Sequence, residues 1–588
     1  MSFYFIAIFL YDILPAVLTY SINFPNLTRV FIVNICQAFA LAYLFTVLGR
    51  ILNKHVKNFL LIIIAVGSFL ISATIIFSER PFSTETLILI SQTDQREVNS
   101  FINQFITPAK IGITIVLLIF YIFSLILTIK WPGNRSLLRK EMIVKILPFI
   151  LLITVIAGFT RFLMFGKIFL IKNTYDFEKW YSLPSILSDS IDHYSEYRNG
   201  DFVTSLIFAF YGYLLNTKDL PVWEKTQLAL INEKFKAAPD SINIVMIIGE
   251  SFIKRHSNLY GYPLVTNPFL TKEAQKGNLA VFNDFITTAN YTAESLRNLL
   301  NLNDLSKGEK WNESPYFPLI ISKSGWRTHL YDNQFTSPTH IADIQLSGMM
   351  RNPLLESHFY EWSNDSIDRF DGDFIDRINN KFPFDKTTGN FDIFHLYGQH
   401  FHPADRYPHE PQFNYWTGDS LPYNRPWFND EKRDIVAQYD NATLYNDYVI
   451  SKIIKRYDGT PALIIYFSDH GEEIYDASDC TVRNEPSQDI EGWLERQFEI
   501  PFFIWASDDY ISGNKESWDN INLSVDKPGM LDNVGQMVLG LCNIKDNPYY
   551  RSSSDILNPG YQEKDRIVSN HFFNYDQQKK EKARKETQ

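Results

Sequence analysis

The stretch of the chain best suited to chemistry is Ser468-Asp469-His470-Gly471-Glu472-Glu473, at the end of the apolar run Ala462 to Phe467. A carboxylate beside an imidazole, placed by a buried strand at the start of a loop, offers oxygen and nitrogen ligands to a divalent metal such as zinc. The same pair could instead cap a following helix. The pattern alone leaves both interpretations open, so the neighbouring strand ends must decide between them.

Short apolar runs recur between helical stretches from Ser241 onward, and they predict the strands that would position such ligands. The runs are Ile242 to Ile248, Ala280 to Ile286, Thr328 to Tyr331, Phe391 to Leu396, Leu463 to Phe467 and Ile500 to Trp505. Their alternation with helices indicates an α/β domain with a mainly parallel central sheet. Ligands of such sheets collect at the carboxyl ends of the strands, so the residues after each run are the first candidates.

Three of these runs lead to residues with ligand or hydroxyl chemistry. Glu250 follows the first run and could bind a metal or begin a helix. His395 lies near the end of the run Phe391 to Leu396 and His400 follows it, and either could be a ligand or simply packed. Thr292 lies in the hydroxyl-rich loop after the second run, where a hydroxyl could also cap a helix.

The set is more informative than its members. Glu250, Asp469 and His470 would supply oxygen and nitrogen ligands and leave one coordination position open. A threonine hydroxyl in that position would lose its proton far more readily than in water, and would become a nucleophile for phosphoryl or sulfuryl transfer. A metal would also neutralise charge on the equatorial oxygens of the transferred group.

Residues 1 to 166 differ in composition and predict a transmembrane domain of five helices. The apolar runs are Phe3 to Tyr20, Val30 to Leu48, Phe59 to Phe77, Ile111 to Ile129 and Ile146 to Phe165, each near the roughly 20 residues that cross a bilayer. The first run has no basic leader and no small-residue cleavage pattern, so we expect it to remain as an anchor. Basic residues gather in the loops after the second and fourth runs, which places those loops in the cytoplasm and everything after Lys167 outside it.

The rest of the chain divides into three predicted regions. Residues 167–240 read as amphipathic and aromatic helices, either along a membrane interface or as a connector on the following domain. Residues 241–570 form the α/β domain, and residues 571–588 form a charged tail that we expect to be disordered and solvated. A net charge of −11 argues against a nucleic-acid partner. At most Cys480 and Cys542 could pair, and their spacing does not require it.

Several motifs in this order resemble the bacterial phosphoethanolamine transferases, membrane members of the alkaline-phosphatase and sulfatase superfamily. The motifs are Gly249-Glu250-Ser251, Tyr260-Gly261-Tyr262, Thr266-Asn267-Pro268, Thr292-Ala293-Glu294-Ser295, His395-Leu396-Tyr397-Gly398-Gln399-His400, Arg406-Tyr407-Pro408, Tyr439-Asp440-Asn441 with Asp447, and Ser468-Asp469-His470-Gly471-Glu472. Five spans followed by one outer domain also fit that family. The resemblance therefore covers nearly the whole chain.

The resemblance implies a zinc enzyme in the inner membrane of a Gram-negative bacterium with its sulfatase-like catalytic domain in the periplasm, and we expect a monomer. Thr292 would take phosphoethanolamine from phosphatidylethanolamine, release diacylglycerol, and pass the group to lipid A, the lipopolysaccharide core or another envelope glycan. Glu250, Thr292, Asp469 and His470 would hold one zinc. His400, together with His395, would contact a second zinc or the phosphate. Thr93 and Glu97 match a family pattern on the donor-lipid side.

Two departures from the family pattern leave alternatives open. No cysteine lies near Thr292, and no histidine occurs between Glu473 and Pro501, where some members carry one. Because this histidine is missing, whether a second zinc binds is left open. Arg483 lies in that region of the sequence and could hold phosphate oxygens or be a surface residue. The nearest rival is a phosphoglycerol transferase of the same fold, a sulfatase fits less well because the loop offers threonine, and a non-catalytic envelope scaffold is the more distant alternative.

Overall fold

The structure is a computed structural model of the 588-residue chain. It describes residues 3–23, 35, 38–39, 42, 52–78, 82, 87, 102, 106–130, 202–235, 242–334, 347–400, 402–479, 481, 492–568 and 573–586. These residues form two compact units that divide between Asn216 and Thr217.

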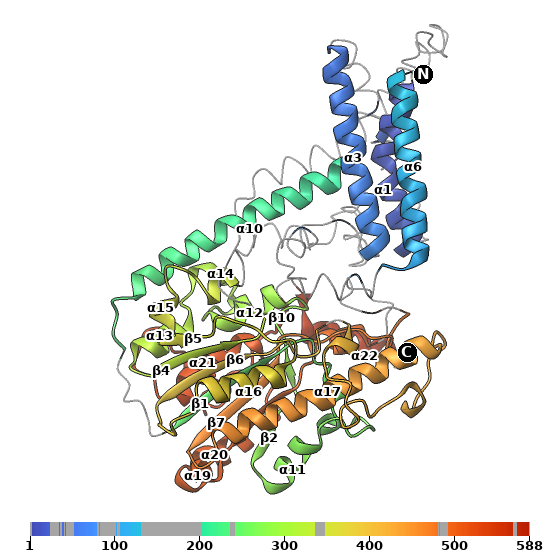
Figure 1. Cartoon of the computed structure of the whole chain (residues 1–588). Coiled ribbons are helices and arrows are strands. Elements are labelled where there is room, and N and C mark those ends of the chain that lie inside the picture. Colours follow the sequence, from blue (N-terminus) through green and yellow to red (C-terminus); the bar gives the residue numbers. More distant parts are fainter. Residues whose placement is uncertain are drawn as a thin grey trace. The chain divides into compact units, whose positions relative to one another are not determined.

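The first unit contains three packed apolar helices, α1 (Phe3–Asn23), α3 (Lys54–Ser78) and α6 (Pro108–Lys130) (Figure 1). Within the described residues, α3 and α6 are long and apolar enough to cross a membrane, whereas α1 contributes a shorter apolar segment. Most of Val30 to Leu48 and all of Ile146 to Phe165 lie outside the described residues. The count of five spans therefore stays a prediction. Helix α10 (Phe202–Leu230) lies in the region predicted to be amphipathic helices.

The second unit is built on a seven-stranded sheet in the order β2-β8-β7-β1-β6-β4-β5. The strands are β1 (Asn243–Gly249), β2 (Leu279–Val281), β4 (Arg327–Asp332), β5 (Trp362–Ser363), β6 (Asn390–His395), β7 (Ala462–Ser468) and β8 (Phe502–Ala506). The strands from β7 to β5 pair in parallel, and β8 runs antiparallel to both of its neighbours. The prediction of an α/β domain with a mainly parallel sheet is confirmed, and the sheet is mixed because β8 runs antiparallel.

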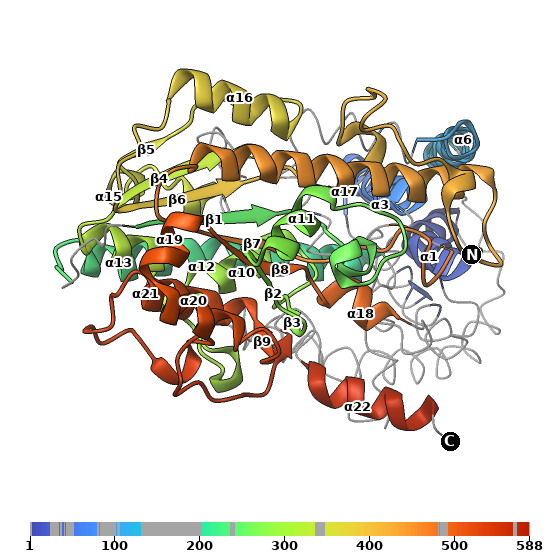
Figure 2. The same ribbon diagram turned by 90° about the horizontal axis from the view of Figure 1, so that it is seen from below.

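Helices cover both faces of this sheet because the strands bury alternate side chains on each face (Figure 2). One face packs against α12 (Thr292–Leu300), α13 (Phe317–Lys323), α20 (Lys515–Asn522) and α21 (Val534–Leu541). The other face packs against α11 (Pro268–Lys276), α16 (Asp371–Lys381) and α17 (Asp430–Arg456). The shorter helices are α14 (Ser347–Met350), α15 (Glu356–Phe359), α18 (Trp493–Phe498) and α19 (Asp508–Gly513).

The run Ala280 to Ile286 is not the single strand that the sequence predicted. The first residues of the run belong to β2, at the edge of the main sheet. Its last residues form β3 (Phe285–Ile286), which pairs instead with β9 (Gly529–Met530) in a separate two-stranded sheet. The break falls at two polar residues within the run. Asn283 bonds Asp526 through its amide, and Asp284 binds Arg566, so both side chains are satisfied outside the main sheet.

The C-terminal tail is also more ordered than predicted. Strand β11 (Phe573–Asn574) pairs with β10 (Ile567–Val568), and helix α22 (Tyr575–Glu586) follows. The buried Tyr575 donates its hydroxyl hydrogen to Glu499 at 3.0 Å, and Lys579 binds the same carboxylate at 2.8 Å. The prediction of disorder for residues 571–588 does not hold for the described residues 573–586, because carboxylates distant in sequence pair with the charged and hydroxyl groups of this segment.

Candidate metal centre

Two neighbouring strands deliver the candidate metal ligands to one point. Strands β1 and β7 are parallel and in register to their last residues, Gly249 opposite Ser468, so the residues that follow emerge side by side. Glu250, Asp469 and His470 are buried, and one ligand atom from each lies within 4.8 Å of the others. Nε2 of His470 is 3.3 Å from Glu250 Oε1 and 3.3 Å from Asp469 Oδ2.

The hydroxyl of Thr292 faces this group. Its Oγ1 lies 3.2 Å from each carboxylate oxygen of Glu250 and 3.2 Å from Nε2 of His470. Thr292 is the first residue of α12, and both this helix and the loop before it are tied to the ligand segment after β7. Within the helix, Ser295 Oγ donates to the main-chain carbonyl of Asp469 at 2.6 Å, and in the loop Thr287 Oγ1 donates to the same oxygen. The four residues Glu250, Thr292, Asp469 and His470 are therefore brought together.

Hydrogen bonding sets the tautomer of His470. Its Nδ1 lies 2.6 Å from the main-chain carbonyl of Gly471, and a carbonyl oxygen can only accept, so Nδ1 carries the hydrogen. In the neutral ring that a metal ligand requires, the lone pair is then on Nε2, the nitrogen that faces Glu250, Asp469 and Thr292. A histidine held in this way by its second nitrogen is the arrangement found at metal ligands.

The carboxyl group of Asp469 lacks a full set of partners. Its Oδ1 accepts the main-chain N–H groups of Ser251 at 3.0 Å and His470 at 2.8 Å, whereas within the described residues Oδ2 accepts no hydrogen bond. Burial and the nearby carboxylate of Glu250 raise the pKa of Asp469 to about 7. Two buried carboxylates this close resist joint ionisation, and a divalent cation between them would offset the repulsion. Two oxygen donors, one nitrogen donor and a hydroxyl fit tetrahedral zinc.

Strand β4 contributes a contact that the sequence analysis missed. Nε2 of Gln334 donates to Glu250 Oε2 at 3.2 Å and to the main-chain carbonyl of Leu396 at 2.8 Å, so it braces a candidate ligand. On the other side, Ser251 Oγ donates to Glu250 Oε1 at 2.9 Å. Gln334 follows the predicted run Thr328 to Tyr331, and inspecting the end of that strand as well would have found it.

Asp332, the last residue of β4, orients His395, another of the predicted site residues. Its Oδ1 is 3.1 Å from Nδ1 of the fully buried His395, and Asp332 lies opposite His395 in the parallel register of β4 and β6. Burial disfavours a charged imidazole, but the Asp332 carboxylate outweighs it and raises the pKa of His395, with Glu250 and Asp469 adding to the effect.

Two further predicted site residues, His395 and His400, do not belong to the three-ligand group. His400 is nearly buried and its ring stacks on Tyr397 with centroids 5.4 Å apart, and among the described residues neither His395 nor His400 joins the cluster of ligand atoms. Arg483, Thr93 and Glu97 lie outside the described residues. Cys542 is buried in the core, and Cys480 is also outside the described residues.

Gly398 explains one feature of the motif around His400. Its φ is +51°, and a Cβ atom there would meet the main-chain N of Glu250 at 2.8 Å and its O at 2.9 Å. The next residue, Gln399, donates its main-chain N–H to that same oxygen of Glu250 at 3.0 Å. Only glycine combines this conformation with so close an approach to the ligand residue.

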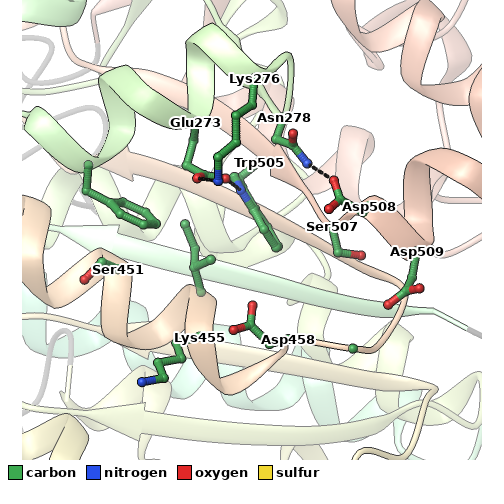
Figure 3. A pocket seen from close by; sticks show the side chains of 13 residues that line it. Glu273, Lys276, Asn278, Ser451, Lys455, Asp458, Trp505, Ser507, Asp508 and Asp509 are labelled. Atoms are coloured by element: carbon green, nitrogen blue, oxygen red, sulfur yellow. Dashed lines mark hydrogen bonds and ion pairs between the residues drawn. The ribbon is translucent and has the colours of Figure 1, made fainter.

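A cavity of about 400 Å³ lies at the opposite end of the sheet (Figure 3). Asn278 precedes β2, Asp458 precedes β7, and Asp508 follows the antiparallel β8, so these lining residues mark the amino end of the parallel strands. Lys276 and Glu273 form an ion pair in its wall. The cavity is therefore separate from the candidate metal centre at the carboxyl end.

Comparisons with known proteins agree with this architecture. A profile of the Sulfatase family matches residues 242–544. The phosphoethanolamine transferase EptC of Escherichia coli is 26% identical over 348 residues, which are 58% of this chain and 58% of that protein. The phosphoethanolamine transferase CptA of Salmonella typhimurium is 25% identical over 498 residues, 84% of this chain and 80% of that protein. The resemblance predicted from the motifs is confirmed, although the chain spans little more than half the length of the EptC relatives.

A solved structure supports the fold over nearly the whole chain. The integral membrane protein lipooligosaccharide phosphoethanolamine transferase A from Neisseria meningitidis superposes with a TM-score of 0.60 at 16% identity. The match covers 95% of this chain and 99% of that one.

Proposed function

The chain belongs to the Sulfatase family, and from that premise we propose that it is a zinc-dependent phosphoethanolamine transferase. The donor is phosphatidylethanolamine, and the acceptor is lipopolysaccharide or another envelope glycan. One observation carries the proposal: Thr292 Oγ1 lies 3.2 Å from both oxygens of Glu250 and from Nε2 of His470. A hydroxyl held among buried metal-type ligands is suited to nucleophilic attack rather than to packing.

Glu250, Asp469 and His470 would hold the zinc ion, with Thr292 in the open position. Zinc bound there would lower the pKa of the threonine hydroxyl and neutralise charge on the phosphoryl oxygens. The hydroxyl donates toward Glu250, which provides an acceptor for the proton that leaves. Asp469 and His470 are fixed by main-chain hydrogen bonds, so the site needs little rearrangement before reaction.

The proposed reaction has two displacements at phosphorus. In the first, Thr292 Oγ1 bonds to phosphorus and the bond from phosphorus to the glycerol oxygen breaks, so that diacylglycerol leaves with a proton. In the second, an acceptor oxygen bonds to the same phosphorus and the bond to Thr292 breaks, which restores the hydroxyl. The intermediate is a phosphoethanolamine ester of Thr292.

Further residues would contact the phosphate and the donor lipid. His395, oriented by Asp332, and the nearby His400 would contact a second zinc or the phosphate of the substrate. Arg483 would bind phosphate oxygens, and Thr93 with Glu97 would lie on the donor-lipid side. These last three assignments rest on the family resemblance.

We also propose that the protein is a monomer in a bacterial inner membrane, with five spans and the catalytic domain in the periplasm. Helices α3 and α6 support a membrane domain by their length and apolar composition. The basic loops of the sequence support the orientation.

The function is tested with the purified full-length protein, zinc, and phosphatidylethanolamine labelled in the ethanolamine carbon atoms. With lipid A as acceptor, we expect labelled lipid A and an equal amount of diacylglycerol by mass spectrometry, and neither product with Thr292→Ala. Phosphatidylglycerol in place of the donor should give no product. Product from phosphatidylglycerol alone would select the phosphoglycerol transferase, and no product from either lipid with any envelope glycan would contradict a transferase.

A further inference from the structure

A buried histidine outside the candidate metal centre, His256, has both ring nitrogens bound by carboxylates. Its side chain is 1% exposed, Nδ1 lies 2.7 Å from Asp440 Oδ1, and Nε2 lies 2.6 Å from Asp476 Oδ2. An ionised carboxylate can only accept hydrogen bonds, so each nitrogen carries a hydrogen and the ring is an imidazolium. Burial opposes this charge, but Asp476 and Asp440 outweigh it and raise the pKa of His256 to about 10.

The other oxygens of the two carboxylates are bonded as well. The hydroxyl of Tyr262 donates to Asp440 Oδ2 at 2.9 Å, and the hydroxyl of Tyr423 donates to Asp476 Oδ1 at 2.9 Å. Burial raises the pKa of both tyrosines, so both remain donors. Nε of Arg496 lies 3.7 Å from Asp476 Oδ2. Two cations therefore balance two anions in a network where all four carboxylate oxygens are bonded.

This network joins the segments that carry the candidate ligands. His256 lies in the loop that begins with Glu250, and Asp476 lies in the loop that begins with Asp469 and His470. Asp440 belongs to α17, a long helix packed on the sheet. A single imidazolium thus spans the β1 loop, the β7 loop and the helix between them.

A second contact from α17 reaches closer to the ligands. The hydroxyl of Tyr439 donates to the main-chain carbonyl of Ser251 at 2.5 Å and accepts the N–H of Ile253 at 2.7 Å. Ser251 has a positive φ of 55° and donates its N–H to Asp469 Oδ1. Neighbouring residues of α17, Tyr439 and Asp440, therefore fix the β1 loop at its start and at His256.

We propose that His256 is a positioning residue: held between Asp440 and Asp476, it fixes the Glu250 loop against the Asp469–His470 loop and thereby sets the metal affinity of the site. Without its charge, Arg496 alone would remain to balance two buried carboxylates, and their repulsion would push the loops apart. The inference rests on the proposed function in taking Glu250, Asp469 and His470 as metal ligands. Neither nitrogen of His256 is left to bind a metal itself.

The test measures zinc affinity of full-length variants by competition with a chromophoric chelator, alongside the thermal unfolding temperature. His256→Gln keeps much of the volume and removes the charge, and we expect it to fold and to bind zinc at least about tenfold more weakly, the range found when groups supporting metal ligands are lost. The matched control is His329→Gln. His329 Nδ1 also binds a carboxylate, Asp392 Oδ1 at 2.6 Å, but His329 lies on β4 away from both loops. The zinc affinity of the His329→Gln protein should therefore be unchanged.

A triple variant separates charge from shape. His256→Gln combined with Asp440→Asn and Asp476→Asn removes the repulsion, and we expect it to bind zinc more tightly than His256→Gln alone but more weakly than the unaltered protein. Unaltered zinc affinity in a folded His256→Gln protein would overturn the inference. If that variant does not fold, unaltered affinity in the triple variant would overturn it. A failure of the unaltered protein to bind zinc would instead contradict the proposed function, which keeps the two failures apart.

Discussion

The side-chain amide of Gln334 donates one hydrogen bond to Glu250 Oε2 at 3.2 Å and one to the main-chain carbonyl of Leu396 at 2.8 Å. The ends of β4, β1 and β6 are therefore linked through one residue. A carboxylate held in this way needs no reorientation to bind a metal, which is the property that the next prediction tests.

Replacing Gln334 by Leu removes both hydrogen bonds at nearly constant volume. A hydrogen bond to a charged group contributes about 1.5–3 kcal/mol, so zinc affinity should fall about tenfold or more. Gln412→Leu is the control. Gln412 also donates a hydrogen bond to a glutamate, Glu410, but this pair is exposed and does not belong to the candidate metal centre. Chelator competition measures the zinc affinity of both variants. Equal zinc affinities in the two would show that Gln334 does not support Glu250.

Gly398→Ala should damage the site from the backbone side. The residue must keep φ near +51°, which costs roughly 1–2 kcal/mol for an alanine, and its Cβ would press on Glu250. We expect a lower unfolding temperature and weaker zinc binding. Gly513→Ala is the control, since a Cβ there meets nothing within 4 Å. A Gly398→Ala protein with unaltered zinc affinity would mean that the Glu250 backbone can move without consequence.

Asp469→Asn should lose zinc and transferase activity together. The change removes one of two buried negative charges and half of the oxygen ligands supplied by carboxylates. Metal analysis and transfer assays on the same preparation make the comparison, with the surface variant Asp519→Asn as control. Chelation of the unaltered protein should abolish activity, and added zinc should restore it. Activity in a metal-free Asp469→Asn protein would argue against metal-assisted transfer.

The charge on His256 should make folding stability depend on pH. Because its pKa rises from 6.5 to about 10 on folding, the folded state binds the proton more tightly. The stabilisation is complete below pH 6.5 and is lost between pH 6.5 and about 10, with a slope of at most about 1.4 kcal/mol per pH unit. Denaturant unfolding across this range should show the decline in the unaltered protein and a shallower one in His256→Gln. Equal slopes would mean that His256 folds without its extra proton.

The sequence was sufficient to predict the residues that meet at the centre. Glu250, Asp469 and His470 follow apolar runs that become adjacent parallel strands, and position at a strand end is a local property of sequence. The prediction of Thr292 relied on an incorrect strand assignment, because β3, the strand before its loop, is not part of the main sheet. Its helix and the loop before it are held by hydroxyl contacts to the Asp469 carbonyl, which no spacing in the sequence encodes.

The supporting contacts could not be predicted because they join distant segments. His256 meets Asp440 and Asp476, and Gln334 meets Glu250, through pairings that exist only once the sheet and α17 are assembled. The tail shows the same limit. Lys579 and Lys582 were predicted to be solvated because their partners, Glu499 and Glu495, are far away in sequence.

The central claim is that Thr292 carries the transferred group, and one measurement tests it directly. The full-length protein is incubated with zinc and phosphatidylethanolamine without acceptor, quenched in acid, digested, and examined by tandem mass spectrometry. We predict a phosphoethanolamine ester on Thr292, absent from Thr292→Ala and lost when lipid A is added before quenching. An unmodified Thr292 in a preparation that still releases diacylglycerol and modifies lipid A, or full activity in Thr292→Ala, would contradict the account.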